Sequence, residues 1–433
     1  MKYLAINKEL FVYNREQFKK MMKPKSVAIF NSNDEMPRNG DQDFPFRQSS
    51  DFFYLTGIDQ PKSVFILFPD CPLEKYREAL FVEQTSEYMA IWYGKKYSQE
   101  EAIQVSGIKN VFWLDTLESA IKEVMASCEY VYLNANENAR YSNPVPYRDI
   151  RYNEDLTKKY PTHKYERSYP IISKLRMIKS KWEIELLKEA INITDKAFRR
   201  VLAFTKPGVM EYEVEAEITH EFIRNRANGH AYAPIIASGK GACVLHYIEN
   251  NKECKNNDLL LLDFGAEYAN YAADLSRTIP VNGKFSPRQK EVYNACLRVM
   301  KAAIKMLVPG TTIDAYHIEV CKIMDKELIG LGLYSEEDVK KQDASKPMYF
   351  NYFMHGTSHY IGLDVHDVGT RQDIIKPGMI FSCEPGIYIQ EEGIGIRIEN
   401  DILVTENGNV DLMAHIPVEV EEIEKLIKKE VLQ

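Results

Sequence analysis

The sequence lacks a long apolar stretch and lacks clustered cysteines. No apolar run approaches the roughly 20 residues that a membrane-spanning helix requires, so we expect no membrane association. The first residues do not show the apolar segment and cleavage site of a signal peptide. The seven cysteines are scattered, without a Cys-x-x-Cys pair. This pattern favours reduced thiols and a cytoplasmic location over a disulfide framework.

Basic clusters are also lacking. The formal net charge is -8, and no block of lysine and arginine stands out, so we expect no nucleic-acid partner. The hydrophobic fraction of 45% and the charged fraction of 27% are typical of a globular protein. A chain of 433 residues is too long for one ordinary core, which predicts two domains.

The domain boundary is predicted near Tyr169-Pro170. Before it, strand-like runs such as residues 63–68 and 130–133 alternate with helical stretches such as residues 116–125, which is typical of an α/β domain. The sequence therefore predicts an amino-terminal domain over residues 1–170 and a second domain over residues 171–433.

The second domain is predicted to begin with two helices. Ser180 and Glu183 form a capping-box pattern at the start of a helix over residues 180–204. Pro207-Gly208 ends that helix, and another is expected over residues 211–228. Strand-like segments at residues 233–239 and 244–247 follow.

The same order of elements recurs further along the chain. Ser286-Pro287 places a cap and a first-turn proline at the start of a third helix. Pro309-Gly310 ends it, and a fourth helix is expected over residues 313–331. We interpret this order as an internal duplication, in which two α+β halves form one catalytic domain.

Each half contains a pair of acids in strand-like surroundings. Asp263 ends the apolar run 259–263, and Asp274 lies in the strand-like run 271–278. With Tyr268 and Ala269 at the centre of the turn, the two aspartates would lie directly opposite each other, with Cβ atoms about 4.5–5.5 Å apart. They would repel each other strongly unless a multivalent cation lay between them.

The residue spacing of the second pair of acids also suits a hairpin. Glu384 ends the run 379–383 and Glu399 follows the run 394–398, so these acids can also face each other across a hairpin. Cys383, beside Glu384, is interpreted as a buried strand residue rather than a nucleophile. A single acid after an apolar run is more often a turn or cap residue, but four such acids argue for a metal site.

A histidine motif, His355-Gly356-Thr357-Ser358-His359, lies between the two pairs. One imidazole with four carboxylates is a plausible ligand set for two divalent ions. Oxygen-rich sites favour Mn²⁺, and the imidazole leaves Co²⁺, Fe²⁺ or Zn²⁺ open.

These motifs resemble those of the pita-bread metallopeptidases and, among them, the aminopeptidase P family. The segment 44–57 resembles the amino-terminal domain of that family. The catalytic-domain motifs that carry the resemblance are Leu262-Asp263-Phe264-Gly265, Ala273-Asp274, His355-Gly356-Thr357-Ser358-His359, Val365-His366-Asp367-Val368-Gly369, Glu384-Pro385-Gly386 and Arg397-Ile398-Glu399. The resemblance implies an α/β amino-terminal domain followed by an α+β pita-bread domain with an internal two-fold pseudo-repeat.

The resemblance also implies roles for individual residues. It implies five ligands of a dinuclear metal site, in which Asp274 and Glu399 bridge the ions, Asp263 binds one ion, and His359 and Glu384 bind the other. A hydroxide between the ions would attack the carbonyl carbon of the first residue of a peptide whose second residue is proline. Glu384 would move protons. The remaining implied positions, in proton transfer or substrate binding, are His246, His355, His366, Tyr232, Tyr388 and Arg397.

Two features depart from the family or stay undecided. The loop 369–377 is short, and whether Arg371 replaces the substrate-side arginine of the family is open. Trp92 matches an aromatic residue that the family presents to a neighbouring subunit, although a buried tryptophan is the ordinary alternative. The resemblance implies a homodimer or homotetramer acting on peptides.

Other functions occur on the same fold. A prolidase, which cleaves only Xaa-Pro dipeptides, shares the site and is disfavoured only by the segment around Arg47–Gly57. Methionine aminopeptidase is disfavoured by the large amino-terminal domain. A non-catalytic binding protein and a metal-independent creatinase-type hydrolase are disfavoured because all five ligand positions are filled.

Overall fold

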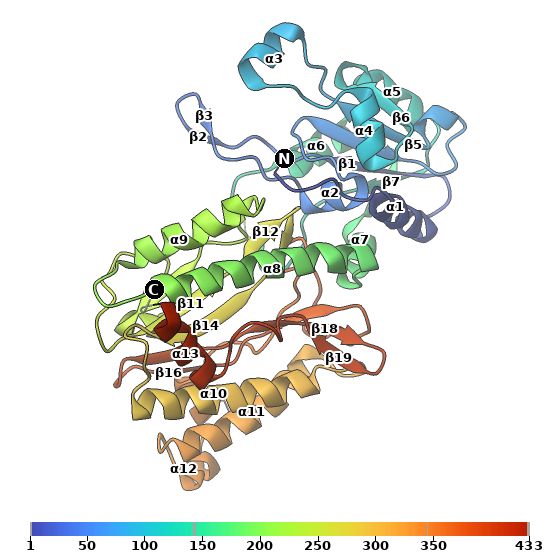
Figure 1. Cartoon of the computed structure of the whole chain (residues 1–433). Helices are drawn as coiled ribbons and strands as arrows, with labels where there is room; N and C mark the ends of the chain where they lie inside the picture. Colours follow the sequence, from blue (N-terminus) through green and yellow to red (C-terminus); the bar gives the residue numbers. More distant parts are fainter. Residues whose placement is uncertain (1, 142–143, 344, 431–433) are drawn as a thin grey trace. The chain divides into compact units, whose positions relative to one another are not determined.

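The computed structural model describes residues 2–141, 144–343 and 345–430 and divides into two compact units (Figure 1). The first unit is Ala5–Arg176, and the second comprises Lys2–Leu4 and the chain from Met177 onward. The division lies at the end of helix α7 (Tyr169–Met177), the helix that starts at the expected boundary. Among the described residues, no helix is both long and apolar enough to cross a membrane.

The first unit is built on a six-stranded mixed sheet with the order β6-β5-β4-β1-β7-β8. The central strand β1 pairs in parallel with β7 and antiparallel with β4. The strands are β1 (Ser26–Asn31), β4 (Ser63–Leu67), β5 (Glu78–Val82), β6 (Asn110–Trp113), β7 (Tyr130–Leu133) and β8 (Lys164–Arg167), with a separate hairpin of β2 (Pro37–Asn39) and β3 (Gln42–Asp43). The helices are α1 (Glu9–Met21), α2 (Ser50–Thr56), α3 (Glu87–Tyr93), α4 (Gln99–Ser106), α5 (Leu117–Met125), α6 (Arg148–Lys159) and α7.

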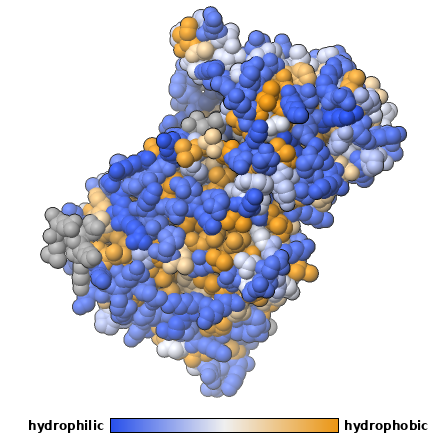
Figure 2. Space-filling view, turned by 45° about the vertical axis from the view of Figure 1, so that its right-hand side comes forward, coloured by the Kyte–Doolittle hydropathy of each residue, from blue (hydrophilic) through white to orange (hydrophobic). Residues whose placement is uncertain are grey.

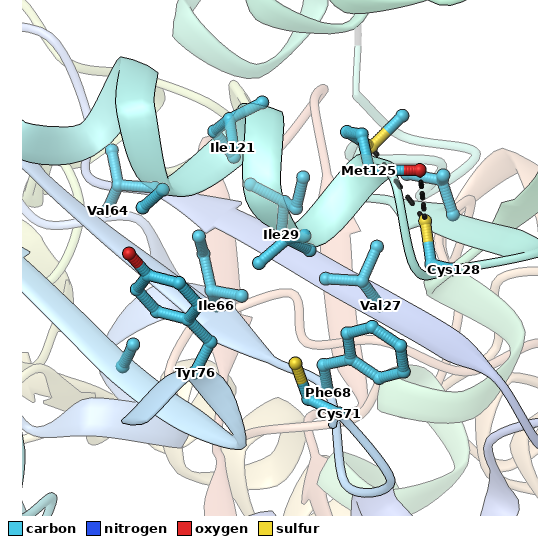
Figure 3. Packing of buried hydrophobic residues seen from close by; sticks show 14 of the residues in the cluster. Val27, Ile29, Val64, Ile66, Phe68, Cys71, Tyr76, Ile121, Met125 and Cys128 are labelled. Carbon is cyan, nitrogen blue, oxygen red and sulfur yellow. Dashed lines mark hydrogen bonds between the residues drawn. The ribbon is translucent and has the colours of Figure 1, made fainter. Parts of the chain in front are cut away.

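One face of this sheet packs against helix α5 (Figure 3). Val27 and Ile29 lie two apart on β1 and therefore point to the same face, where they join Ile121 and Met125 of α5 in one buried cluster. This packing explains why the strands read as apolar runs in the sequence.

Helix α3 differs from the other described α-helices of the first unit, because it has no buried residue. Ser86 caps it by accepting a hydrogen bond from the Met89 amide. Trp92 is 68% exposed and its neighbour Tyr93 is 73% exposed. The ordinary alternative of a buried tryptophan is therefore wrong for this residue.

The second unit contains two similar halves. In each, two long helices precede a three-stranded antiparallel sheet, β10-β11-β14 in the first half and β15-β18-β19 in the second. The first pair of helices and the second pair lie on opposite sides of the central strands (Figure 1). The helices are α8 (Lys181–Phe204), α9 (Glu211–Arg224), α10 (Pro287–Met306), α11 (Ile313–Gly330), α12 (Glu336–Lys341) and α13 (Val420–Glu430). The predicted duplication is confirmed.

The predicted capping box at Ser180 and the predicted serine cap at Ser286 are both present. Ser180 accepts a hydrogen bond from the Glu183 amide at the start of α8, and the Glu183 side chain bonds back to the Ser180 amide. Ser286 and Gln289 do the same at the start of α10. These caps satisfy amide groups that the first turn of a helix leaves without partners.

The strands of the second unit are short and mostly buried. They are β9 (Gly229–His230), β10 (Ile235–Ser238), β11 (Leu259–Phe264), β12 (Ala266–Tyr268), β13 (Tyr271–Ala272), β14 (Leu275–Pro280), β15 (Ile380–Cys383), β16 (Gly386–Ile389), β17 (Ile394–Arg397), β18 (Asn400–Thr405) and β19 (Gly408–Asp411). The predicted strand at 244–247 is wrong. These residues follow the 3₁₀ helix η3 (Gly239–Cys243) and form an irregular segment.

The register of the first hairpin differs from the prediction. The turn is centred on Ala269 and Asn270, which both have positive φ, so Tyr268 pairs with Tyr271. Asp263 is consequently opposite Ser276 rather than Asp274. Because Asp274 and Ser276 are two residues apart, Asp274 becomes the diagonal neighbour of Asp263 on the same face.

In the second hairpin the two glutamates do occupy facing positions. Gly386 pairs with Arg397 on one side of them, and Cys383 pairs with Asn400 on the other. Both pairs have the register that aligns Glu384 with Glu399, in the gap between the two ladders. Cys383 is a buried residue of β15, as predicted.

Candidate metal centre

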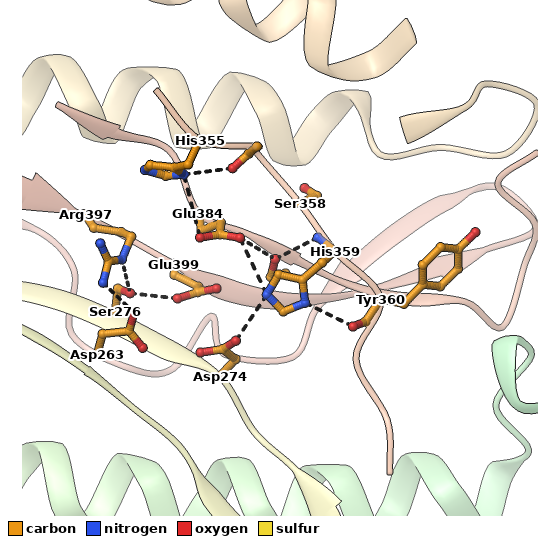
Figure 4. Close-up of polar contacts among 12 residues, drawn as sticks. Asp263, Asp274, Ser276, His355, Ser358, His359, Tyr360, Glu384, Arg397 and Glu399 are labelled. Atoms are coloured by element: carbon orange, nitrogen blue, oxygen red, sulfur yellow. Dashed lines mark hydrogen bonds and ion pairs between the residues drawn. The ribbon is translucent and has the colours of Figure 1, made fainter. Parts of the chain in front are cut away.

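The two halves of the second unit bring the predicted acids together around His359 (Figure 4). Asp274 and Glu399 are buried, and each can offer one oxygen to a common ion with the Nε2 or Nδ1 atom of His359. The three ligand atoms lie within 4.8 Å of one another. Glu384 joins the group, because its Oε1 atom lies 3.5 Å from His359 Nε2.

The orientation of the His359 ring suits a metal ligand. Its Nδ1 atom lies 3.0 Å from the Tyr360 carbonyl oxygen, which can only accept a hydrogen bond, so Nδ1 carries the hydrogen. The Nε2 atom, which lies 3.3 Å from Asp274 Oδ2, is therefore the ring atom that can bind a metal ion. A backbone carbonyl behind the ring is the usual way in which proteins orient a histidine ligand.

The buried carboxylates of the cluster would be stabilised by a cation. Burial, followed by repulsion from Asp274, raises the pKa of Glu399 well above its ordinary value, and burial also raises the pKa of Glu384 to about 7. Glu399 Oε2 accepts a hydrogen bond from Ser276, whereas Glu399 Oε1 is buried without a hydrogen-bond partner. A buried carboxylate oxygen without a donor is costly. These observations fit a site that binds divalent ions through carboxylates.

Asp263 lies on the other side of the cluster and is held by two groups. Arg397 forms an ion pair with its Oδ2 atom, and the Tyr232 hydroxyl lies 2.7 Å from its Oδ1 atom. The same hydroxyl also contacts Asp274. Burial, Asp263 and Asp274 together raise the pKa of Tyr232 well above 10, so the phenol stays protonated and can donate to either carboxylate.

A chain of three side chains leads from Arg397 to His355. Arg397 Nη1 donates to the Tyr388 hydroxyl at 2.9 Å, and that hydroxyl lies 2.9 Å from His355 Nε2. His355 Nδ1 faces the Gly356 carbonyl oxygen at 2.9 Å and must carry the hydrogen, so Nε2 accepts from Tyr388. Burial, with Arg397 nearby, lowers the pKa of His355 to about 3. His355 is therefore a neutral imidazole.

The other two predicted histidines differ in their placement. The His366 ring packs edge-on against the His359 ring, with centroids 4.5 Å apart, so His366 belongs to the site. His246 is exposed. Its neighbour Tyr247 packs in a cluster that contains Tyr388, which brings the His246 segment beside the chain described above.

The structure also locates Arg371. Its guanidinium forms an ion pair with Asp314. Its Nη1 atom would lie 2.9 Å from a Cβ atom on Gly356, so a side chain at Gly356 would collide with it. Arg371 therefore lies beside the histidine motif, one residue from His355.

Sequence reasoning missed two polar residues of the centre. Ser276 donates to Glu399 and accepts from Arg397 Nε at 3.0 Å. Asp401 is buried and accepts the Asp274 amide hydrogen at 3.2 Å. Each lies two residues after a predicted ligand, Asp274 or Glu399, and strand periodicity could have placed them on the same face.

Comparisons with known proteins define the class. Residues 185–406 match metallopeptidase family M24, and residues 11–132 match the aminopeptidase P amino-terminal domain. The chain is 35% identical to Xaa-Pro aminopeptidase of Escherichia coli strain K12, over 98% of each chain. It is 30% identical to human Xaa-Pro aminopeptidase 3, over 92% of this chain and 80% of the relative. The chain belongs to metallopeptidase family M24.

Solved structures narrow the comparison to aminopeptidase P. A low-pH form of the E. coli enzyme superposes with a TM-score of 0.90 at 34% identity, covering 99% of this chain and 100% of that chain. The E. coli enzyme with the inhibitor Pro-Leu gives a TM-score of 0.88 at 34% identity, with the same coverage. The similarity therefore extends over both units and is not limited to the catalytic domain.

Proposed function

We propose that the protein is a metal-dependent aminopeptidase that releases the first residue of peptides whose second residue is proline. The observation that carries the proposal is the buried cluster of Asp274, His359 and Glu399, in which one oxygen of Glu399 has no donor. The relatives support the substrate class, since they are named Xaa-Pro aminopeptidases and one solved E. coli structure contains the inhibitor Pro-Leu.

We assign two divalent ions, most simply Mn²⁺, to the four acids and one imidazole predicted from the sequence. Asp263, Asp274, His359, Glu384 and Glu399 would hold them. A zinc-substituted form of the E. coli enzyme with product shows that a relative accepts Zn²⁺. When bound, such ions lower the pKa of water and polarise the scissile carbonyl group.

The side chains around the ions would carry out the remaining steps. Glu384 would accept the proton of the attacking water and deliver it toward the proline nitrogen, which has no hydrogen before cleavage and must gain one. His355, whose Nδ1 atom lies 3.9 Å from Glu384 Oε2, would be the donor or relay of this proton near the proline nitrogen. His366 and His246 would bind the peptide and stabilise the oxyanion.

The substrate pocket would be completed by residues that contact these groups. Tyr388 orients His355 through its hydroxyl, and Arg397 orients Tyr388. The Tyr232 hydroxyl contacts Asp263 and Asp274, and the Tyr232 ring would form one wall of the pocket for the proline ring. Arg371, which lies beside Gly356, would serve as the substrate-side arginine.

We also propose that the protein is a cytoplasmic homo-oligomer. All seven cysteines are buried and free, which suits a reducing compartment. The exposed side chains of α3 form a hydrophobic patch that would suit a subunit contact; the patch is Tyr88, Ile91, Trp92 and Tyr93. Orange atoms are visible at the top of Figure 2, where Figure 1 draws α3.

Activity and metal content test the proposal together. The purified protein, loaded with Mn²⁺, should release the first residue from a tripeptide with proline in second position, and a chelator should abolish the release. Glu384→Gln should lose turnover and keep its fold. Glu391→Gln, an exposed acid of the same hairpin, is the matched control. Full activity without metal, or in the Glu384 variant, would refute the mechanism. Cleavage of the Xaa-Pro dipeptide but not the tripeptide would indicate a prolidase.

A further inference from the structure

Helix α11 contacts the histidine motif at two consecutive residues. The His317 Nδ1 atom lies 2.8 Å from the Thr357 hydroxyl, and the Ser358 hydroxyl donates to the Tyr316 hydroxyl at 3.4 Å. Thr357 and Ser358 are both buried. Tyr316 and His317 are adjacent near the start of the helix, where Thr312 caps it by accepting the Ala315 amide hydrogen. The motif is thus held by a capped, regular element.

Thr357 connects this contact to the centre. It lies two residues from His355 and two from His359, so a rotation of its backbone would move both rings. Its carbonyl oxygen accepts the Glu384 amide hydrogen at 2.8 Å. The same helix also touches the residue before Glu384, because Tyr316 and the Cys383 sulfur are 3.6 Å apart.

A second, apolar contact runs in parallel with the hydrogen bond. The Phe353 ring packs against His317 at a centroid distance of 5.9 Å and against His355 at 5.0 Å. Cys321 lies one turn further along α11, with its sulfur 3.5 Å from His317 Nε2. The groups around the imidazole are therefore neutral, except for Arg371 and Asp314, which pair with each other.

The His317 ring is itself uncharged at neutral pH. Burial and, to a smaller extent, Arg371 lower its pKa to about 4. A neutral imidazole forms a hydrogen bond of fixed geometry with a hydroxyl and adds no charge to the field of the carboxylates. Together with the contact to Thr357, this gives His317 a supporting role.

We infer that His317 is a positioning residue, which holds Thr357 and through it sets the placement of His355, His359 and Glu384. The inference rests on the proposed peptidase function. Partners behind metal ligands typically change metal affinity or activity by about 10–100-fold when they are removed. A displacement of reacting groups by about 1 Å can cost about 100-fold in rate.

Three variants test the bond from both of its ends. His317→Leu removes the ring nitrogen, and Thr357→Val removes the hydroxyl at nearly constant shape. His317→Asn retains a polar atom near the position of Nδ1 and should rescue. His220→Leu, an exposed histidine of α9, is the control. For each, kcat and KM on a Xaa-Pro-Yaa tripeptide, Mn²⁺ affinity by calorimetry of the metal-free protein, and Tm are measured.

The expected result has a specific pattern. His317→Leu and Thr357→Val should each lower kcat by about 10–100-fold, weaken Mn²⁺ binding, and leave KM within about twofold. A variant that combines His317→Leu with Thr357→Val should lose no more kcat and Mn²⁺ affinity than either single variant, because both substitutions remove the same bond. His317→Asn should recover most of kcat, and His220→Leu should behave as the wild type.

Other results would overturn the inference. These are wild-type kcat and Mn²⁺ affinity in both Thr357→Val and His317→Leu, additive losses in the double variant, or no recovery in His317→Asn. If His317→Leu fails to fold, Thr357→Val alone decides. A wild-type protein that binds Mn²⁺ but cleaves no Xaa-Pro peptide would count against the proposed function instead. The calorimetric comparison would still test the role of His317.

Discussion

Lys179 and Asp367 form a fully buried ion pair, with Lys179 Nζ 2.9 Å from Asp367 Oδ2 and each side chain 1% exposed. Asp367 directly follows His366. Gly362 makes room for the pair, since a Cβ atom there would lie 2.1 Å from Asp367 Oδ2. The Asp367 amide also donates to the Tyr360 carbonyl oxygen. The ion pair therefore stabilises the segment of chain between His359 and His366.

Replacing Lys179 by methionine should destabilise the protein strongly. The substitution removes the buried cation beside the Asp367 carboxylate, and breaking a buried ion pair typically costs about 3–5 kcal/mol. Chemical denaturation should show this loss in the free energy of unfolding. Lys181→Met, two residues away and exposed, should change stability by less than about 0.5 kcal/mol. Equal stability of the two variants would show that the ion pair does not hold the turn.

The carboxylate cluster predicts an unusual pH dependence for the metal-free protein. Burial raises the pKa of Glu384 to about 7, so the folded state binds more protons than the unfolded state between the ordinary glutamate pKa and about pH 7. Stability must then fall as pH rises through this window. For Glu384 alone the loss between pH 6 and pH 8 is on the order of 1 kcal/mol.

Metal binding should remove this dependence. Ions replace the protons on the carboxylates, so the Mn²⁺-loaded protein should be stabilised more by metal at pH 8 than at pH 6. Thermal unfolding with chelator and with Mn²⁺ at both pH values measures the difference. A chelated protein that is more stable at pH 8 than at pH 6, with the same gain from Mn²⁺ at both, would contradict the assignment.

The two hairpins show what the sequence could predict and where it fell short. For Glu384 and Glu399 the facing arrangement followed from residue spacing. For Asp263 the same arithmetic was off by two, because the turn centre lies one residue later, at Ala269 and Asn270. Turns with two positive φ values favour asparagine, so Asn270 was an available signal.

Contacts between residues far apart in the sequence could not be predicted from such patterns. The Lys179–Asp367 and Arg397–Asp263 pairs join residues 188 and 134 positions apart. No periodicity or capping motif specifies which distant cation meets which acid, since tertiary packing decides it. The candidate metal ligands could be proposed from the sequence because their motifs are local, whereas the supporting pairs became visible only in the folded chain.

Glu211 offers a test of how the His246 segment is held. Its buried carboxylate accepts hydrogen bonds from the amides of Ser238 and Lys252 at 2.7 and 2.9 Å. It also accepts from the hydroxyls of Ser238 and Tyr247, both at 2.7 Å. The carboxylate therefore ties the start of η3 to the far end of the loop that carries His246.

Glu211→Gln should destabilise the protein by about 1–3 kcal/mol, because the amide NH₂ group would face donors where the carboxylate accepted. It should also raise KM, since the His246 segment would be less well placed for the peptide. Denaturation and steady-state kinetics measure both effects. Glu249→Gln, exposed in the same loop, is the control. A Glu211 variant with wild-type stability and KM would show that the loop is held by other contacts.

The exposed aromatic residues of α3 predict a subunit contact that can be disrupted without touching the catalytic domain. Ile91 is 79% exposed and Trp92 is 68% exposed. Such exposure is unfavourable in water for a helix without buried residues, and covering it would contribute about 25 cal/mol per Å² of apolar area. Replacing both residues by serine should shift the protein in light scattering toward the 50.1 kDa chain mass. Tyr13→Ser, a singly exposed aromatic on α1, should leave the mass unchanged. An oligomer that persists in the double variant, or a wild-type protein that is already monomeric, would exclude α3 as the contact.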